Sequence, residues 1–256
     1  MNYKVKQQKV YDRAGRLIKG YSGNFRADTG ECLAITSDKY KIVHHQDALD
    51  AVLSCLDFGD YKRKLYSIKD GRRLYAVYDF NDQRQQIQAG DDVGFRLLLK
   101  NSYDGSCGVD LAAGLLRIIC TNGMVVMAKD NHVTRQHRSR DNNEIDLSFL
   151  TETIKQSKMQ WTASVDFFKA MSNTPITQRE GVEMVESMVK DEVIAKIHAE
   201  EIKKIWDKPT YDLDNSRSTY NLYNAVTQYL TPLAEEKFEQ VQRTSRKVLQ
   251  YINKWV

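Results

Sequence analysis

Three short Asp-Gly or Asn-Gly pairs between apolar segments constrain the fold of this chain more than any other feature. The pairs are Asp70-Gly71, Asp104-Gly105 and Asn122-Gly123, and each lies between segments rich in β-forming residues. A two-residue type I′ turn requires positive φ at both central positions, which these residue types tolerate. The spacing therefore predicts an antiparallel β-meander across roughly residues 62–130.

The residues before the meander predict an N-terminal arm and one helix. Residues 1–35 mix glycine, aspartate, arginine and lysine with few apolar periods, so we expect an arm or an irregular entry segment. Between residues 46 and 56, apolar residues recur at helical spacing, which favours a short helix ahead of the first predicted strand.

Beyond residue 141 the apolar spacing becomes helical. Thr177 and Glu180 have the spacing of a capping box, in which each side chain binds the backbone amide of the other residue. We therefore predict the α+β class, with an antiparallel β-meander followed by a helical C-terminal half. The expected divisions are an N-terminal arm at 1–35, a β-rich core with one helix at 36–140, and a helical region at 141–256 that packs on the core.

Composition argues against several classes of function. The chain lacks the roughly 20 consecutive apolar residues that a membrane span requires, and its N-terminus lacks the apolar stretch of a secretory signal. We therefore expect a cytoplasmic protein without a membrane partner. The four cysteines form no Cys-x-x-Cys pair, and the sequence contains neither a phosphate-binding loop nor a Gly-x-Ser-x-Gly motif. We predict no metal, no cofactor and no enzymatic activity.

Positive charge is concentrated in the first part of the chain. Residues 1–150 hold 23 lysine and arginine residues against 19 acidic ones, whereas residues 151–256 hold 15 of each. An excess of this size is weak support for nucleic-acid binding, so the positions of the charges matter more than their sum.

The first predicted hairpin carries the clearest binding pattern. If Asp70-Gly71 is its turn, side-chain alternation gathers lysine, arginine and tyrosine on one face of two neighbouring strands. Tyrosines among cations are typical of surfaces that stack bases and follow a phosphate backbone. The alternative is a solvated sheet face with an ordinary cross-strand aromatic pair, and the sequence leaves both open. The candidate DNA-binding residues here, one of them from the turn, are Lys62, Lys64, Tyr66, Arg72, Arg73 and Tyr75.

A second basic cluster spans residues 132–140 and contains no acidic residue. Each lysine or arginine that neutralises a phosphate releases a counterion, which favours a phosphate contact here. A plain linker between the β-rich and helical parts is equally consistent with the pattern. The candidate DNA-binding residues of this cluster are Arg135, His137, Arg138 and Arg140.

Arg117 and Cys120 lie in the apolar segment before the third predicted turn. With Asn122-Gly123 as a type I′ turn, Cys120 pairs opposite Val125 inside the strand, where a free thiol packs as a small hydrophobic side chain. Arg117 is a cation among apolar neighbours, so it either pairs with a buried acid or points into a groove. The second alternative makes Arg117 a further candidate DNA-binding residue.

The segment from about residue 90 to residue 137 resembles an uncharacterised family, a domain of unknown function carried by phages, plasmids and integrative elements. The resemblance covers roughly residues 35–230 and rests on two turns and an Arg-x-x-Cys sequence that agree at once. It implies that the motif consists mainly of structural turns. The motif residues are Asn101, Ser102, Asp104, Gly105, Ser106, Arg117, Cys120, Asn122 and Gly123, with His137 following.

A meander followed by helices is similar in plan to the phage single-strand annealing proteins of the Redβ and Erf kind. Those proteins resemble a eukaryotic ring-forming annealing recombinase, in which a β-β-β-α core oligomerises and holds single-stranded DNA in a basic groove. The resemblance implies an ATP-independent, homo-oligomeric protein that binds and anneals single-stranded DNA for homologous recombination of a phage or mobile element in a bacterial host. The alternative is a phage or mobile-element protein that binds and inhibits a host defence or replication factor. A Cys120-dependent or metal-dependent enzyme is the least supported hypothesis.

Overall fold

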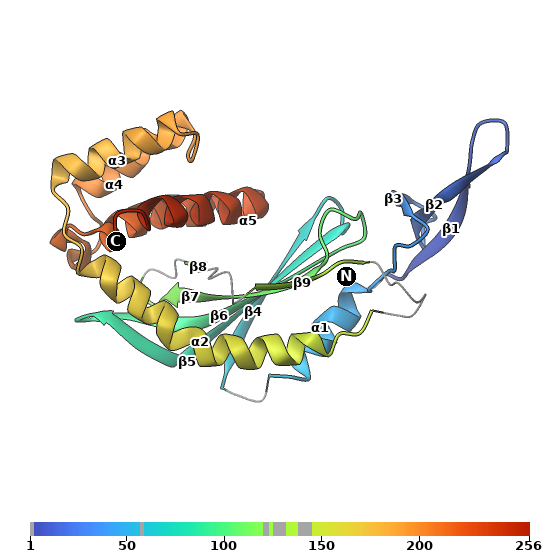
Figure 1. The fold of residues 1–256 in the computed structure, drawn as a ribbon, viewed down its shortest axis with the longest axis horizontal. Coiled ribbons are helices and arrows are strands. Elements are labelled where there is room, and N and C mark those ends of the chain that lie inside the picture. Colours follow the sequence, from blue (N-terminus) through green and yellow to red (C-terminus); the bar gives the residue numbers. More distant parts are fainter. Residues whose placement is uncertain (1–2, 57–58, 120–122, 125–131, 138–144) are drawn as a thin grey trace. The chain divides into compact units, whose positions relative to one another are not determined.

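The predicted α+β class is confirmed by a computed structural model of the 256-residue chain, with antiparallel sheets first and helices afterwards (Figure 1). The structure describes all residues except 1–2, 57–58, 120–122, 125–131 and 138–144. It describes only the backbone of residues 81, 123–124, 132–133, 135 and 160.

The chain folds into two compact units, each made of three separate segments. Unit 1 consists of Met1–Tyr78, Leu97–Ala112 and Lys129–Lys158, and unit 2 consists of Asp79–Arg96, Ala113–Ala128 and Met159–Val256. Three strands run from one unit into the other. They are β5 (Arg73–Gln88), β6 (Asp91–Ser102) and β7 (Val109–Arg117).

Residues 5–37 form a three-stranded antiparallel sheet in unit 1, where an irregular arm was predicted. The strands, which pair in chain order, are β1 (Val5–Tyr11), β2 (Leu17–Arg26) and β3 (Cys32–Ser37). The turn between β1 and β2 is held by the Asp12 carboxylate, which accepts hydrogen bonds from the amides of Ala14 and Arg16. The prediction was wrong because few side chains of this sheet are buried, so the sequence shows little apolar alternation.

The predicted antiparallel meander is confirmed in the second sheet. Its strand order is β4-β5-β6-β7-β8, and β9 pairs with the first residues of β7. The remaining strand bounds are Tyr61–Ile68 for β4, Gly123–Met124 for β8 and His132–Arg135 for β9. In this order β4 is an edge strand, whereas β5 has a neighbouring strand on each side.

Two of the three predicted turns are longer than a two-residue type I′ turn. Between β4 and β5, positive φ is found at Lys69 as well as at Asp70 and Gly71. Between β6 and β7, the Asp104 carboxylate accepts a hydrogen bond from the amide of Ser106, and the connection runs from the end of β6 at Ser102 to Val109. The Asp-Gly pairs therefore mark the positions of the turns but not their lengths.

The third predicted turn is wrong. Gly123 lies inside β8, where it pairs with Leu116, so it is not a central residue of the turn. β7 ends at Arg117, which makes the connection longer than an Asn-Gly turn requires. The expected pairing of Cys120 with Val125 falls outside the described residues.

A buried polar cluster around His45 fixes a helix of unit 1 in place. This helix, α1 (His45–Leu53), corresponds to the predicted helix at 46–56. His45 Nδ1 accepts a hydrogen bond from Asn101 Nδ2 at 2.9 Å, so its Nε2 carries the proton and donates to Gly71 O at 2.9 Å. The imidazole stacks on the ring of Tyr103 with centroids 3.9 Å apart. Asn101, a motif residue, is therefore part of the core.

Acid is expected to destabilise unit 1 through His45. Burial lowers the pKa of this imidazole from 6.5 to about 4. Between pH 6.5 and pH 4 the unfolded chain binds a proton at this residue and the folded chain does not, so stability falls as the pH drops. The loss is about 3 kcal/mol over the whole interval and about 2 kcal/mol between about pH 7 and about pH 4.5. Urea unfolding at about pH 7 and about pH 4.5 measures the difference, and His45→Gln, which keeps a donor for Gly71 O, should show a smaller one. An equal pH dependence in both proteins would contradict this role.

The first of the helices that follow begins in unit 1 and continues into unit 2, and the later helices belong to unit 2. They are α2 (Phe149–Ser172), α3 (Gln178–Lys190), α4 (Lys196–Asp207), the 3-10 helix η2 (Asp212–Ser216) and α5 (Thr219–Ile252). The predicted capping box is confirmed, because Thr177 Oγ1 accepts from the Glu180 amide and the Glu180 carboxylate accepts from the Thr177 amide. In the described part of the chain, no helix is long and apolar enough to cross a membrane.

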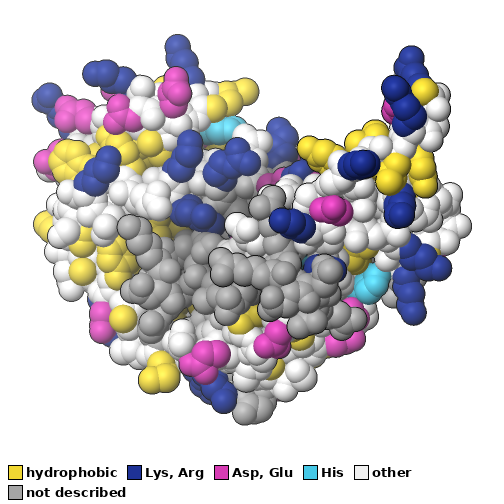
Figure 2. All heavy atoms as spheres, turned by 45° about the vertical axis from the view of Figure 1, so that its right-hand side comes forward, with side chains coloured by type: hydrophobic (Ala, Val, Ile, Leu, Met, Phe, Trp, Pro, Cys, Tyr) yellow, Lys and Arg dark blue, Asp and Glu magenta, His cyan; other side chains and the backbone are white. Residues whose placement is uncertain are grey.

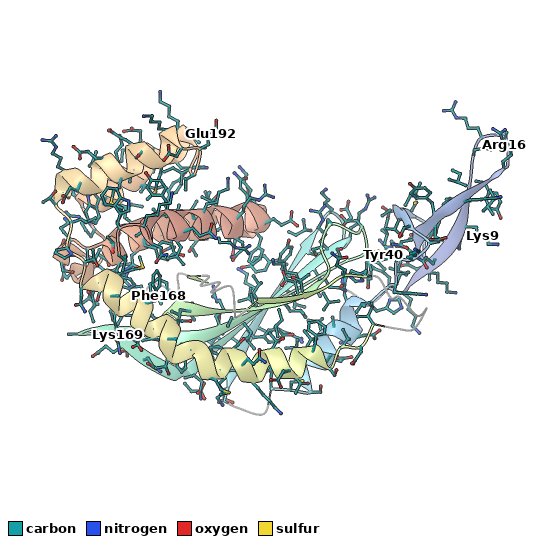
Figure 3. All side chains as sticks on the ribbon, in the orientation of Figure 1. Lys9, Arg16, Tyr40, Phe168, Lys169 and Glu192 are labelled. Carbon is teal, nitrogen blue, oxygen red and sulfur yellow. The ribbon has the colours of Figure 1, made fainter. Side chains whose placement is uncertain are left out.

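The core of unit 2 is aromatic. The ring of Phe168 (Figure 3) contacts the rings of Tyr220 and Tyr223, each with a centroid distance of 5.9 Å. α3 and α4 approach closely at Gly181, where a Cβ atom would lie 2.3 Å from the ring of Trp206. Glycine is therefore required at this contact.

Candidate nucleic-acid interface

Part of the predicted basic and aromatic face is accessible on β4. Lys62 and Lys64 are exposed and Tyr66 is half-buried. The ammonium group of Lys64 lies 5.2 Å from the centroid of the Tyr66 ring, within range of a cation–π interaction. These three side chains therefore belong to the accessible surface of unit 1.

The partners predicted on β5 and in the turn are placed differently. Tyr75 is only 6% exposed, so the prediction that Tyr75 stacks on bases is wrong. Arg73 Nε donates to Asp104 Oδ2 at 2.7 Å, and Arg72 Nη2 donates to Glu31 Oε1 at 3.1 Å. Both arginines therefore form ion pairs with acidic residues of unit 1. The predicted continuous basic face with Lys62 and Lys64 is not observed.

Arg117 is not an interface residue, which corrects its place among the DNA-binding candidates. Its side chain is fully buried in unit 2 between two carboxylates. Arg117 Nη2 lies 2.6 Å from Asp91 Oδ2, and Nη1 lies 2.8 Å from Asp214 Oδ2. Burial alone would lower the pKa of Arg117, but the hydrogen bonds to both carboxylates raise it above its ordinary value. Of the two alternatives for this residue, the buried ion pair is the one observed.

The second basic cluster is only partly described. His137 is buried, donates from Nδ1 to Lys41 O at 2.9 Å, and stacks on Tyr40 with centroids 4.8 Å apart. A direct phosphate contact by His137 is therefore wrong, since burial also lowers the pKa of the imidazole. The side chain of Arg135 and the whole of Arg138 and Arg140 fall outside the described residues.

A further exposed basic surface lies on β1 and β2, within the residues for which an N-terminal arm was predicted. We call residues 5–26 the ribbon. β3 pairs with Tyr21–Phe25 of β2, so the chain from Tyr11 to Lys19 forms two strand ends and a turn, and no other described strand pairs with them (Figure 1). Tyr11 and Tyr21 are 59% and 53% exposed, and Leu17 and Ile18 are exposed as well.

The charge of the ribbon is strongly positive. It contains six lysine and arginine residues and one acidic residue, Asp12, whereas the whole chain has a formal net charge of +4. Figure 2 shows Lys and Arg side chains along the projecting hairpin, and Figure 3 places Lys9 and Arg16 on it. Arg16 pairs with Asp12, while Lys6, Lys9 and Lys19 are exposed. A charge count in a window shorter than 150 residues would have found this surface in the sequence.

The motif residues between β6 and β7 form a tight connection in unit 1. Ser102 Oγ donates to Cys107 O at 2.7 Å and accepts from the Cys107 amide at 3.2 Å. The Asp104 carboxylate accepts from the Ser106 amide at 3.0 Å, and Gly105 has a φ of 72°. The structural role expected for Ser102, Asp104, Gly105 and Ser106 agrees with these contacts.

Residues 32–250 match the protein family described as Domain of unknown function (DUF932). The chain belongs to the DUF932 family. No curated protein and no solved structure matches the chain. The match carries no function, and neither a phage origin nor a relationship to annealing proteins follows from it. The matched residues of the DUF932 chain include the whole connection between β6 and β7, whereas β1 and β2 precede them.

The described part of the DUF932 chain offers little for covalent or metal chemistry. No group of three or more His, Cys, Asp or Glu side chains among these residues is placed to hold a metal ion. Cys107 and His137 line one pocket, but burial raises the pKa of the thiol and lowers that of the imidazole. Both groups are therefore neutral at pH 7, unlike an activated thiolate–imidazolium pair.

Proposed function

We propose that this protein binds single-stranded DNA on the ribbon and on the edge strand β4, both in unit 1. It would anneal complementary strands without ATP, as a homo-oligomer, in the recombination of a phage or mobile element. The observation that carries the proposal is the uncovered basic ribbon with its two exposed tyrosines, Tyr11 and Tyr21.

The chemistry of the ribbon favours a single strand over a duplex. Exposed lysines neutralise phosphates without base preference, and tyrosine rings stack on bases that are not already stacked in a duplex. Lys62, Lys64 and Tyr66 on β4 repeat the same combination. Both surfaces lie in unit 1, so one strand contacting both would remain within a single compact unit.

Two general features support annealing and self-association. Annealing requires no covalent step, and it needs strands held by their backbones with bases left accessible. β1 and β4 are edge strands, and an edge strand presents backbone groups that can pair with a second copy of the chain.

Binding is expected to weaken steeply as salt rises, because phosphate contacts release counterions. Fluorescence anisotropy with a labelled strand of about 30 nucleotides, measured across a salt series, gives the affinity and its slope. A duplex of the same sequence serves as the control and should bind more weakly. A second assay follows the pairing of two complementary strands by energy transfer. No binding at low salt, or an affinity independent of salt, would contradict the proposal.

A further inference from the structure

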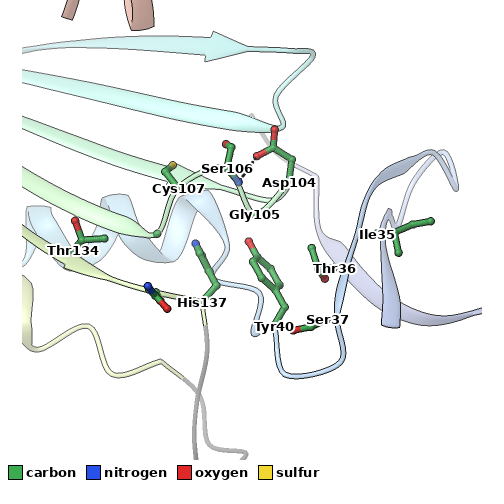
Figure 4. A pocket seen from close by; sticks show the side chains of 12 residues that line it. Ile35, Thr36, Ser37, Tyr40, Asp104, Gly105, Ser106, Cys107, Thr134 and His137 are labelled. Carbon is green, nitrogen blue, oxygen red and sulfur yellow. Dashed lines mark hydrogen bonds between the residues drawn. The ribbon is translucent and has the colours of Figure 1, made fainter. Parts of the chain in front are cut away.

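A pocket in unit 1 adjoins the ribbon. It has a volume of about 530 Å³, within the range of small-molecule sites. Its walls come from β3, the connection between β6 and β7, and the residues at and after the end of β9 (Figure 4). Three residues of the β3 wall pair directly with β2 of the ribbon, namely Ile35 with Gly23, Thr36 with Ser22, and Ser37 with Tyr21.

The wall of this pocket contains a buried hydrogen-bond acceptor without a partner among the described residues. His137 is 4% exposed, and its Nε2 atom makes no hydrogen bond there. Because a carbonyl oxygen only accepts, the contact with Lys41 O fixes the proton on Nδ1. Nε2 therefore presents a lone pair, and Figure 4 shows a ring nitrogen of His137 pointing toward the connection that carries Cys107. A buried acceptor of this kind calls for a donor.

The other polar groups of the pocket define the charge of its ligand. Thr36 Oγ1 is also buried without a partner among these residues. The Asp104 carboxylate is already bound by Arg73 and by the Ser106 amide, and the lining residues that the structure describes include no lysine or arginine. A phosphate group would find a carboxylate and a lone pair in this wall. A neutral ligand with N–H donors fits it.

The geometry points to a nucleobase as the ligand of this pocket, with an N–H of the base donating to His137 Nε2. A base is planar and uncharged, and it carries both N–H donors and carbonyl or ring-nitrogen acceptors. The pairing of the pocket wall with β2 places the site next to Tyr21, so a strand held on the ribbon can insert one base. In this form the inference rests on the proposed function, while the pocket itself accepts a base from either a strand or a free nucleoside.

Calorimetric titration of the full chain with each of the four deoxynucleosides tests the inference. At least one should bind, and its derivative methylated at the donating N–H should bind about 10-fold more weakly, as expected for one lost hydrogen bond. Bound nucleoside should also slow the alkylation of Cys107, which lines the pocket, but not that of the exposed Cys32. If no nucleoside binds with a Kd below about 10 mM, or if the methylated form binds equally well, the inference is wrong.

Two variants separate the pocket from the fold. His137→Asn keeps an N–H donor for Lys41 O but removes the acceptor in the pocket, so nucleoside affinity should fall about 10-fold. If this variant unfolds at a lower temperature, Thr36→Val, which is similar in shape and lacks the hydroxyl, replaces it and should weaken binding. Unchanged nucleoside affinity in the folded variants would overturn the inference.

The same measurements distinguish the pocket from the proposed function. If single-stranded DNA binds with a steep salt dependence and no nucleoside binds, the pocket inference fails and the proposed function stands. If a nucleoside binds and single-stranded DNA does not, the proposed function fails and the pocket remains a site for a free nucleoside.

Discussion

Replacing Arg117 with methionine is expected to lower the free energy of unfolding by about 3–5 kcal/mol. The substitution leaves the buried carboxylates of Asp91 and Asp214 without a counter-ion, and removing one partner of a buried ion pair costs far more than the pair itself contributes. Asn221 and Asn224 donate to Asp214 Oδ1, but these two amides are neutral and do not replace the positive charge of the guanidinium. Urea unfolding monitored by circular dichroism measures the loss.

Two further variants show whether the uncompensated charges cause this loss. Adding Asp91→Asn and Asp214→Asn to Arg117→Met should restore part of the stability, because no buried charge then remains in the triad. Arg179→Met is the control, since Arg179 forms an exposed pair with Glu183 on α3 and should change stability little. If Arg117→Met were as stable as the parent chain, the triad would not hold unit 2 together.

Neutralising three ribbon lysines is expected to weaken single-stranded DNA binding on the order of 100-fold at about 0.1 M salt. The variant combines Lys6→Gln, Lys9→Gln and Lys19→Gln, all at exposed positions of β1 and β2. Each lost phosphate contact on a single strand lowers the salt slope by about 0.7, so the slope should fall by about 2. Anisotropy across the salt series gives both numbers.

A matched variant in unit 2 controls for net charge. Lys190, Lys196 and Lys208 are exposed, and their replacement by glutamine removes the same formal charge from a different surface. This control should bind single-stranded DNA nearly as well as the parent chain. Equal losses in the two variants would show that net charge, rather than the ribbon, sets the affinity.

The sequence predicted those parts of the fold that a few neighbouring residues determine, such as turns and helix caps. Asp-Gly pairs located two connections of the meander, because few residue types tolerate positive φ. The capping box at Thr177 and Glu180 was predicted from its spacing alone and is present. The predicted turn at Asn122-Gly123 is wrong because β7 ends at Arg117 and Gly123 pairs with Leu116, a register that the local sequence does not determine.

The candidate site depended on information that a local pattern does not carry. Side-chain alternation grouped Tyr75 with Lys62 and Lys64, but alternation does not show that tertiary packing buries Tyr75 and leaves the two lysines exposed. Arg117 meets Asp214, which is 97 residues away in the sequence, so its role could not be chosen from its neighbours. The ribbon was missed because a two-stranded element exposed on both faces has little apolar periodicity, although its charge was visible in the sequence.

Photo-crosslinking is the most direct test of the proposed interface. A single strand that carries 4-thiothymine is bound to the full chain, irradiated and digested, and the crosslinked peptides are identified by mass spectrometry. We expect crosslinks within residues 5–26, at or beside Tyr11 and Tyr21, and weaker ones on β4 near Tyr66. Salt-sensitive binding with crosslinks confined to α3, α4 or α5 would contradict the account.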